Sequence, residues 1–303
     1  MIEELEKKKF HKIPVVGKLI SFIQRIRLPW LEGLSLYELL ELYISGIVKG
    51  AFSYRSSAIA FSFFMALFPF TLFILNLLPY IPIEGFQEDF MKFVEEGVPP
   101  TTFEAIKSII DDILNNSYKG LLSSGFILSI FLMTNGVNAI LGGFETSYHI
   151  TMSRGIVRQY LVALAMSLLL SAILIVTVAA IVISEIFIQS IDLDIFAFQL
   201  TRYIFVILML LIVVSLLFKF GAKQTKQIPF ISIGSVFTTV LIIISSYFFG
   251  IYVVKFATYN ELYGSIGTLL ILMFYIWLNC TVLLLGFELN AAINTLKRKN
   301  LYQ

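Results

Sequence analysis

Charged residues are scarce in this sequence. Only 14% of the 303 residues are Asp, Glu, Lys or Arg, whereas 58% are hydrophobic, and the mean hydropathy is +0.89. A soluble domain has about 25% charged and 45–50% apolar residues. The composition therefore excludes an ordinary soluble domain and predicts a polytopic membrane protein. The net charge of +2 also lacks the strong positive excess that is typical of nucleic-acid binding, so no nucleic-acid partner is expected.

Residues that carry common chemistry are scarce too. The only cysteine, Cys280, lies in an apolar run, so no intramolecular disulfide can form. The only histidines, His11 and His149, are far apart in the sequence, and no GxxxxGK[ST], HExxH or GxSxG pattern occurs. A ribonuclease would need a metal-binding acidic cluster or a positioned acid and base. We therefore predict no enzymatic activity, no catalytic residue, no metal site and no other cofactor.

Long apolar runs, in contrast, are abundant. A bilayer core of about 30 Å is crossed by about 20 helical residues. Six segments are long enough, at approximately 57–80, 121–144, 160–184, 199–218, 229–254 and 264–290. They predict an all-α fold with six transmembrane helices, in a membrane domain of residues 57–293.

Lys and Arg are unevenly distributed around these segments. Seventeen of the 22 fall on the side of the N-terminus, and twelve of the 20 acidic residues fall on the opposite side. Because cytoplasmic loops retain cations, we expect both termini in the cytoplasm. This places an N-terminal region, 1–56, and a basic tail, 294–303, on the cytoplasmic side.

Two regions outside the spans have amphipathic helical patterns. In "SLYELLELYISGIVKG" the apolar residues recur at helical spacing, and Ser35 with Glu38 matches a capping box. This segment predicts a helix along the cytoplasmic membrane surface, or alternatively a helix packed under the bundle. In the external loop 81–120, "VPPTTFEAIKSIIDDIL" predicts a helical cap that begins with a capping box of Thr101 and Glu104.

Polar residues form a stripe on the second span. Asn135, Asn138, Gly142 and Glu145 follow one another at spacings of three, four and three, which places them on one helix face. Such a stripe avoids lipid. It either forms interhelical hydrogen bonds that hold the bundle together, or lines a hydrated cavity that opens to the cytoplasm.

Glu288 ends the apolar run of the last span, where an isolated charge is costly. Arg55 at the start of the first span should lie at the same cytoplasmic depth, so we predict that it pairs with Glu288, with Glu145 as a third member. The pair either latches the bundle or contacts a substrate headgroup. Within the first span, Pro69 leaves one backbone carbonyl without its usual partner and predicts a kink, which is either structural or a hinge.

Four stretches carry a resemblance to a known family: "RSSAIAFSFFMALFPFTLFILNLLP", "VPPTTFEAIKSIIDDIL", "KFGAKQTKQIPFISIGSVFTTVL" and "LYGSIGTLLILMFYIWLNCTVLLLGFELNAAI". From about residue 45 to 293 the sequence resembles the YihY/virulence factor BrkB family, formerly labelled ribonuclease BN. The last stretch carries the family motif residues Tyr263, Gly264, Gly286, Glu288 and Asn290. The resemblance implies a six-helix protein of the bacterial inner membrane that works in the envelope.

These observations lead to one functional hypothesis and two rivals. The hypothesis is transport or handling of an amphipathic envelope substrate, such as a lipid or lipid-linked molecule, which predicts a cavity lined by Arg55, Asn135, Asn138, Glu145 or Glu288. A non-transporting scaffold predicts instead a dry bundle with all its polar groups paired. The legacy label predicts metal-dependent RNA cleavage. Membrane lipids are the expected partners, and the sequence leaves the oligomeric state, the substrate and any coupling ion open.

Overall fold

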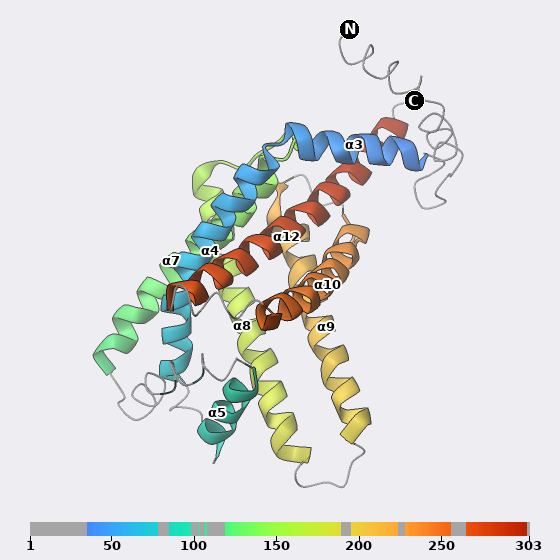
Figure 1. Ribbon diagram of the computed structural model, residues 1–303. Coiled ribbons are helices and arrows are strands. Elements are labelled where there is room, and N and C mark those ends of the chain that lie inside the picture. The colour runs from blue at the N-terminus through green and yellow to red at the C-terminus, as the bar shows by residue number, and fades with distance from the viewer. Residues whose placement is uncertain are drawn as a thin grey trace.

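The computed structural model describes residues 35–77, 85–97, 103, 107, 119–188, 195–223, 228–255 and 265–301. These residues are almost entirely helical and include no β-strand. Their helices are α3 (Leu36–Lys49), α4 (Phe52–Leu77), α5 (Phe86–Gly97), α7 (Lys119–Glu145), α8 (Ile156–Ile188), α9 (Ile195–Gly221), α10 (Ile233–Lys255) and α12 (Ser265–Leu301) (Figure 1). The predicted all-α fold is confirmed.

Each predicted span corresponds to one long helix. Within the described residues, α7, α8, α9, α10 and α12 each contain a stretch long and apolar enough to cross a membrane. The pair of α3 and α4 meets the same criterion when taken together, which allows up to six crossings. Only 17% of the apolar stretch of α8 and 11% of that of α10 is buried within the protein, and exposed apolar side chains such as Leu161 of α8 and Val240 of α10 are available to lipid. The sidedness of the termini stays a prediction.

Helix α3 is separated from α4 by a sharp bend of 63°. Its N-terminus has the predicted capping box, since Ser35 Oγ accepts from the Glu38 backbone N–H (3.3 Å) and Glu38 Oε2 accepts from the Ser35 N–H (2.9 Å). Between the two helices Ala51 has a positive φ of 47°, which a non-glycine residue seldom adopts. The strained residue marks a defined elbow, and α3 packs across the last part of α12 (Figure 1).

Pro69 lies inside α4, which continues through it as one helix. In Figure 1 the ribbon of α4 changes direction where its colour turns from blue to cyan, as expected of a helix that contains proline. Whether this part of α4 acts as a hinge stays a prediction.

The loop between α4 and α7 contains α5, which lies at the opposite end of the bundle from α3 (Figure 1). Phe103 in the same loop is helical and buried, and Lys107 places its ammonium 5.8 Å from the Phe103 ring centroid. The other residues of the predicted helical cap, including Thr101 and Glu104, lie outside the described residues. At the other end of the chain, α12 continues through the predicted tail as far as Leu301.

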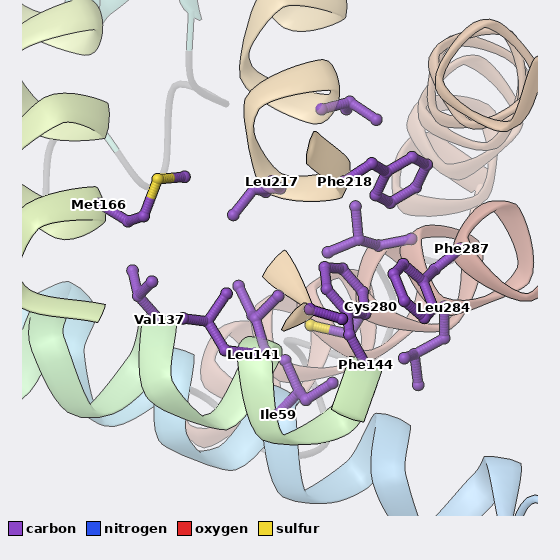
Figure 2. Packing of buried hydrophobic residues seen from close by; sticks show 14 of the residues in the cluster. Ile59, Val137, Leu141, Phe144, Met166, Leu217, Phe218, Cys280, Leu284 and Phe287 are labelled. Atoms are coloured by element: carbon purple, nitrogen blue, oxygen red, sulfur yellow. The ribbon is translucent and has the colours of Figure 1, made fainter. Parts of the chain in front are cut away.

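Three phenylalanines from three helices form the centre of the apolar core. Phe144 of α7 stacks on Phe287 of α12 with ring centroids 4.1 Å apart, and Phe218 of α9 meets both rings edge-on (Figure 2). All three are at most 1% exposed. Offset-stacked and edge-to-face contacts are the favoured aromatic geometries, so this cluster ties α9 to α7 and α12.

Helices α10 and α12 cross at unusually close range because glycines face each other there. A Cβ added to Gly286 would lie 1.6 Å from Thr238 Oγ1 and 2.9 Å from the Gly234 carbonyl oxygen. Small residues permit this approach between transmembrane helices. The motif residue Gly286 is thus needed for packing, which the motif pattern alone did not reveal.

We expect Gly286→Ala to lower the thermal stability of the protein in detergent. The added methyl group forces α10 away from α12, an overpacking effect of about 1–3 kcal/mol. Gly250→Ala is the matched control, because a Cβ at Gly250 of α10 meets nothing within 4 Å and alanine favours a helix interior. Equal melting temperatures for the Gly286→Ala protein and the wild type would contradict the close crossing.

Candidate functional site

Arg55 and Glu288 form the predicted ion pair. Arg55 Nη1 lies 2.7 Å from Glu288 Oε1, and the two side chains are 5% and 0% exposed. Arg55 also donates from Nε to the Gly143 carbonyl (2.8 Å) and from Nη1 to the Gly50 carbonyl (3.1 Å). A buried charge needs a partner and further hydrogen bonds to offset desolvation, and this arginine has both. The pair connects α4, α7 and α12 at the end of the bundle where α3 lies.

The second carboxylate oxygen of Glu288 is bound from another direction. Ser147, just after α7, donates from Oγ to Glu288 Oε2 (2.8 Å) and also accepts from the His149 backbone N–H (3.4 Å). His149 is buried, and its Nε2 lies 3.0 Å from the Leu42 carbonyl of α3. Gly46 of α3 fits between them, since a Cβ there would lie 2.7 Å from His149 Nε2 and 2.9 Å from Glu288 Oε2. Helix α3 therefore covers the ion pair.

Tyr43 of α3 also lies close enough to Glu288 to be affected by its charge. Burial, and next the negative charge of Glu288, raise the pKa of the Tyr43 hydroxyl to about 12. Tyr43 is therefore neutral at any physiological pH. The group around Glu288 thus combines the Arg55 guanidinium and the Glu288 carboxylate with the polar side chains of Ser147, His149 and Tyr43.

Glu145 is not the third member of this group. Its carboxylate lies 3.3 Å from Arg154 Nη1 and accepts from the Arg154 backbone N–H (2.9 Å). Arg154 in turn donates to the carbonyls of Phe220 and Gly221 at the end of α9, where helical carbonyls lack partners. Burial lowers the Arg154 pKa and Glu145 opposes that change. The predicted third member is therefore wrong. Glu145 is paired with Arg154 instead, and Arg154 lies in the loop between α7 and α8, where a helical pattern does not reveal it.

The asparagines of the second span contact α8. Asn135 Oδ1 accepts from the Tyr160 hydroxyl (3.3 Å), and Asn138 Oδ1 accepts from Gln159 Nε2 (3.0 Å). Of the two alternatives for the polar stripe, these contacts match the first, in which its side chains form interhelical hydrogen bonds. Asn290 of α12 also forms an interhelical hydrogen bond, because its Oδ1 accepts from the Gly234 backbone N–H (2.9 Å) at the start of α10.

An apolar cavity of about 490 Å³ lies between the helices, away from the ion pair. Six long helices contribute to its wall, for example through Phe63, Val137, Leu170, Val213, Ile242 and Ile276. These residues lie away from the helix ends. Arg55, Asn135, Asn138, Glu145 and Glu288 do not line it, so the predicted polar lining is wrong for this cavity.

Several polar groups in the cavity wall form hydrogen bonds within the protein. Ser171 donates to the Ser167 carbonyl (2.6 Å), and Asn279 donates to the Tyr275 carbonyl (2.9 Å). The Tyr275 hydroxyl lies 2.8 Å from Ser246 Oγ. Most of the remaining wall is apolar. Cys280 lies in this wall and in the core cluster (Figure 2).

Sequence reasoning predicted a cavity with a polar lining, but it did not identify this apolar cavity, and it did not place Ser147 or His149 beside Glu288. No pattern distinguishes an apolar residue that lines a cavity from one that faces lipid, because both are simply apolar. Ser147 and His149 follow the end of the second span directly, beside the polar stripe. Their position next to Glu145 is the one signal that could have pointed to them.

The sequence matches the model of the virulence factor BrkB family over residues 44–302. The chain belongs to the virulence factor BrkB family. The ribonuclease-like protein YfkH of Bacillus subtilis (strain 168) is 32% identical over 82% of this chain and 91% of its own length. A UPF0761 membrane protein of Coxiella burnetii (strain Dugway 5J108-111) is 25% identical over 77% of this chain and 85% of its own length. No solved structure matches the chain.

This BrkB-family chain keeps three of the motif residues at packing or pairing positions. Glu288 pairs with Arg55, Gly286 lies at the crossing with α10, and Asn290 caps the start of α10. Tyr263 and Gly264 lie outside the described residues. Within the described part of the chain there is no group of three or more His, Cys, Asp or Glu that could hold a metal ion.

We expect Glu288→Gln to lower thermal stability clearly, because Arg55 is left as a buried charge without a charged partner. Removing one member of a buried pair typically costs about 3–5 kcal/mol. The double variant Arg55→Gln with Glu288→Gln should lose less than the sum of the two single losses.

Glu95→Gln is the control for the same chemical change, since Glu95 is exposed on α5. Thermal unfolding in detergent measures all four variants. Strictly additive losses, or a Glu288→Gln protein as stable as the wild type, would refute a stabilising pair.

Proposed function

We propose that this membrane protein handles or transports an amphipathic envelope molecule, such as a lipid or lipid-linked molecule, whose apolar part occupies the cavity between the helices. The observation that carries this proposal is the cavity itself. Its volume of about 490 Å³ falls within the range of roughly 300–1,000 Å³ for ligand pockets. Its mainly apolar wall suits a hydrocarbon chain better than a headgroup.

The chemistry of the wall favours an apolar occupant over a hydrophilic solute. A polar solute needs free hydrogen-bond partners when it leaves water. The Ser171 hydroxyl and the Asn279 side-chain nitrogen donate to carbonyls of their own helices. A hydrocarbon chain needs no such partners and gains contacts with the wall.

The ion pair has a structural part in this function. Arg55, Glu288 and Ser147 hold α4, α7 and α12 together at one end of the bundle, and none of the three lines the cavity. We therefore infer that the pair is a latch rather than a headgroup contact. The sequence contains no ATPase motif, so any transport is passive, ion-coupled or driven by a partner.

A membrane scaffold is the second candidate. It is supported by the hydrogen bonds of Asn135, Asn138 and Asn290, which lie within the protein rather than toward a hydrated path. RNA cleavage is not proposed for this chain. The ribonuclease-like name belongs to the Bacillus relative, and the described residues contain no group of three or more His, Cys, Asp or Glu that could hold a metal ion.

We expect Val213→Phe to displace the bound molecule, because the larger ring fills part of the cavity. Val206→Phe is the matched control: Val206 is on the same helix, is 40% exposed and does not line the cavity. Lipid mass spectrometry on gently purified protein should show one lipid class enriched over the surrounding membrane in the wild type and in Val206→Phe. The enrichment should be lost in Val213→Phe.

The same three proteins, reconstituted in vesicles that contain a fluorescent lipid, test movement of the lipid between leaflets. Transport predicts faster exchange for the wild type and for Val206→Phe than for Val213→Phe. Bulk membrane lipid in all three samples, together with equal exchange rates, would overturn the proposal and favour the scaffold.

A further inference from the structure

The surface of α3 divides into three sectors when its residues are placed on a helix of 3.6 residues per turn. One sector faces the protein. Leu39 is 5% exposed and packs with Ala292 and Leu296 of α12, while Gly46 lies against His149 and Glu288. This sector explains why α3 is held at its place on the bundle.

The second sector is polar, and its members follow one another at helical spacing. They are Glu38, Glu41, Ser45 and Lys49. A helix that packed on the protein and otherwise faced water would need only these two sectors.

The third sector is apolar and uncovered within the described part of the chain. Leu40, Ile44 and Val48 recur every four residues and are 36%, 56% and 74% exposed. The exposed fraction grows toward the elbow with α4, where the chain enters the long apolar helices. Three large exposed apolar side chains in one line are typical of a surface that contacts a membrane or another apolar partner.

Other exposed apolar residues lie at the same end of the bundle. Tyr54, at the start of α4 just past the elbow, is 78% exposed, and Tyr148 and Met152 between α7 and α8 are 51% and 59% exposed. Lys49 Nζ lies 5.6 Å from the Tyr148 ring centroid. Tyrosine and lysine with an apolar stem are typical of the boundary between headgroups and acyl chains.

We propose that α3 lies in the headgroup region of the bilayer, with Leu40, Ile44 and Val48 toward the acyl chains of the leaflet. The occupant of this surface is the bilayer itself. The bend of 63° directs α3 away from α4 and toward the membrane plane, as an interfacial helix requires. The polar sector then faces water, and the protein-facing sector covers the Arg55–Glu288 pair. This inference is independent of the proposed function, since it needs no bound molecule in the cavity.

Fluorescence quenching tests the three sectors one residue at a time. Ile44→Cys and Val48→Cys report on the apolar sector, and Ser45→Cys, a near-isosteric change beside Ile44, is the control in the polar sector. Each variant carries Cys280→Ala and a bimane label, in vesicles of phosphatidylethanolamine and phosphatidylglycerol. Lipids with a nitroxide near the headgroup are the membrane quencher, and iodide is the aqueous quencher.

We expect the nitroxide lipid to quench the labels at positions 44 and 48 strongly and iodide to quench them weakly. The label at position 45 should show the reverse order. If iodide quenches all three equally, α3 lies in water and the inference is wrong. If neither quencher reaches positions 44 and 48, protein covers the sector, and the inference is equally wrong.

Folding of each variant is checked by a single symmetrical peak on gel filtration. Should Cys280→Ala not fold, the same labels are placed in the wild-type background, where Cys280 is 7% exposed. The unsubstituted protein then supplies the labelling blank.

Discussion

The cost of burying a charge in a membrane protein constrains one whole end of this bundle. Glu288 is completely buried, so its two carboxylate oxygens must be satisfied by the protein. Arg55 binds one of them and Ser147 the other, and Arg55 also binds the Gly143 carbonyl. The partners come from α4, α7 and the segment that follows α7. One carboxylate on α12 thus determines how three parts of the chain meet.

Helix α3 completes this arrangement. Gly46 has no side chain, so its backbone approaches His149 and Glu288, and the contact of Leu39 with α12 holds the helix there. Further along the bundle the contacts between helices are mostly apolar, and the cavity lies in that region. The buried ion pair at one end and the apolar cavity further along are thus two distinct parts of the molecule. Membrane helices gain little from burying apolar surface against each other, so the polar contacts and the close glycine crossing supply specificity.

A separate set of contacts fixes the connections between helices. Arg154 binds Glu145 and the last carbonyls of α9, and Asn290 caps the start of α10. Both satisfy helix ends, where backbone groups lack partners and water is limited. This is a physical reason for polar residues in these segments that requires no substrate.

The sequence by itself determined the helices and one ion pair. Runs of about 20 apolar residues specify spanning helices because unpaired backbone groups are too costly in lipid, and the cost of an isolated charge pointed from Glu288 to Arg55. Only the tertiary structure decided that Glu145 binds Arg154, that Gly286 crosses Gly234 closely, and where the cavity lies. These depend on helix orientation and loop position. The sequence does not distinguish an apolar residue that faces lipid from one that faces a neighbouring helix or a cavity.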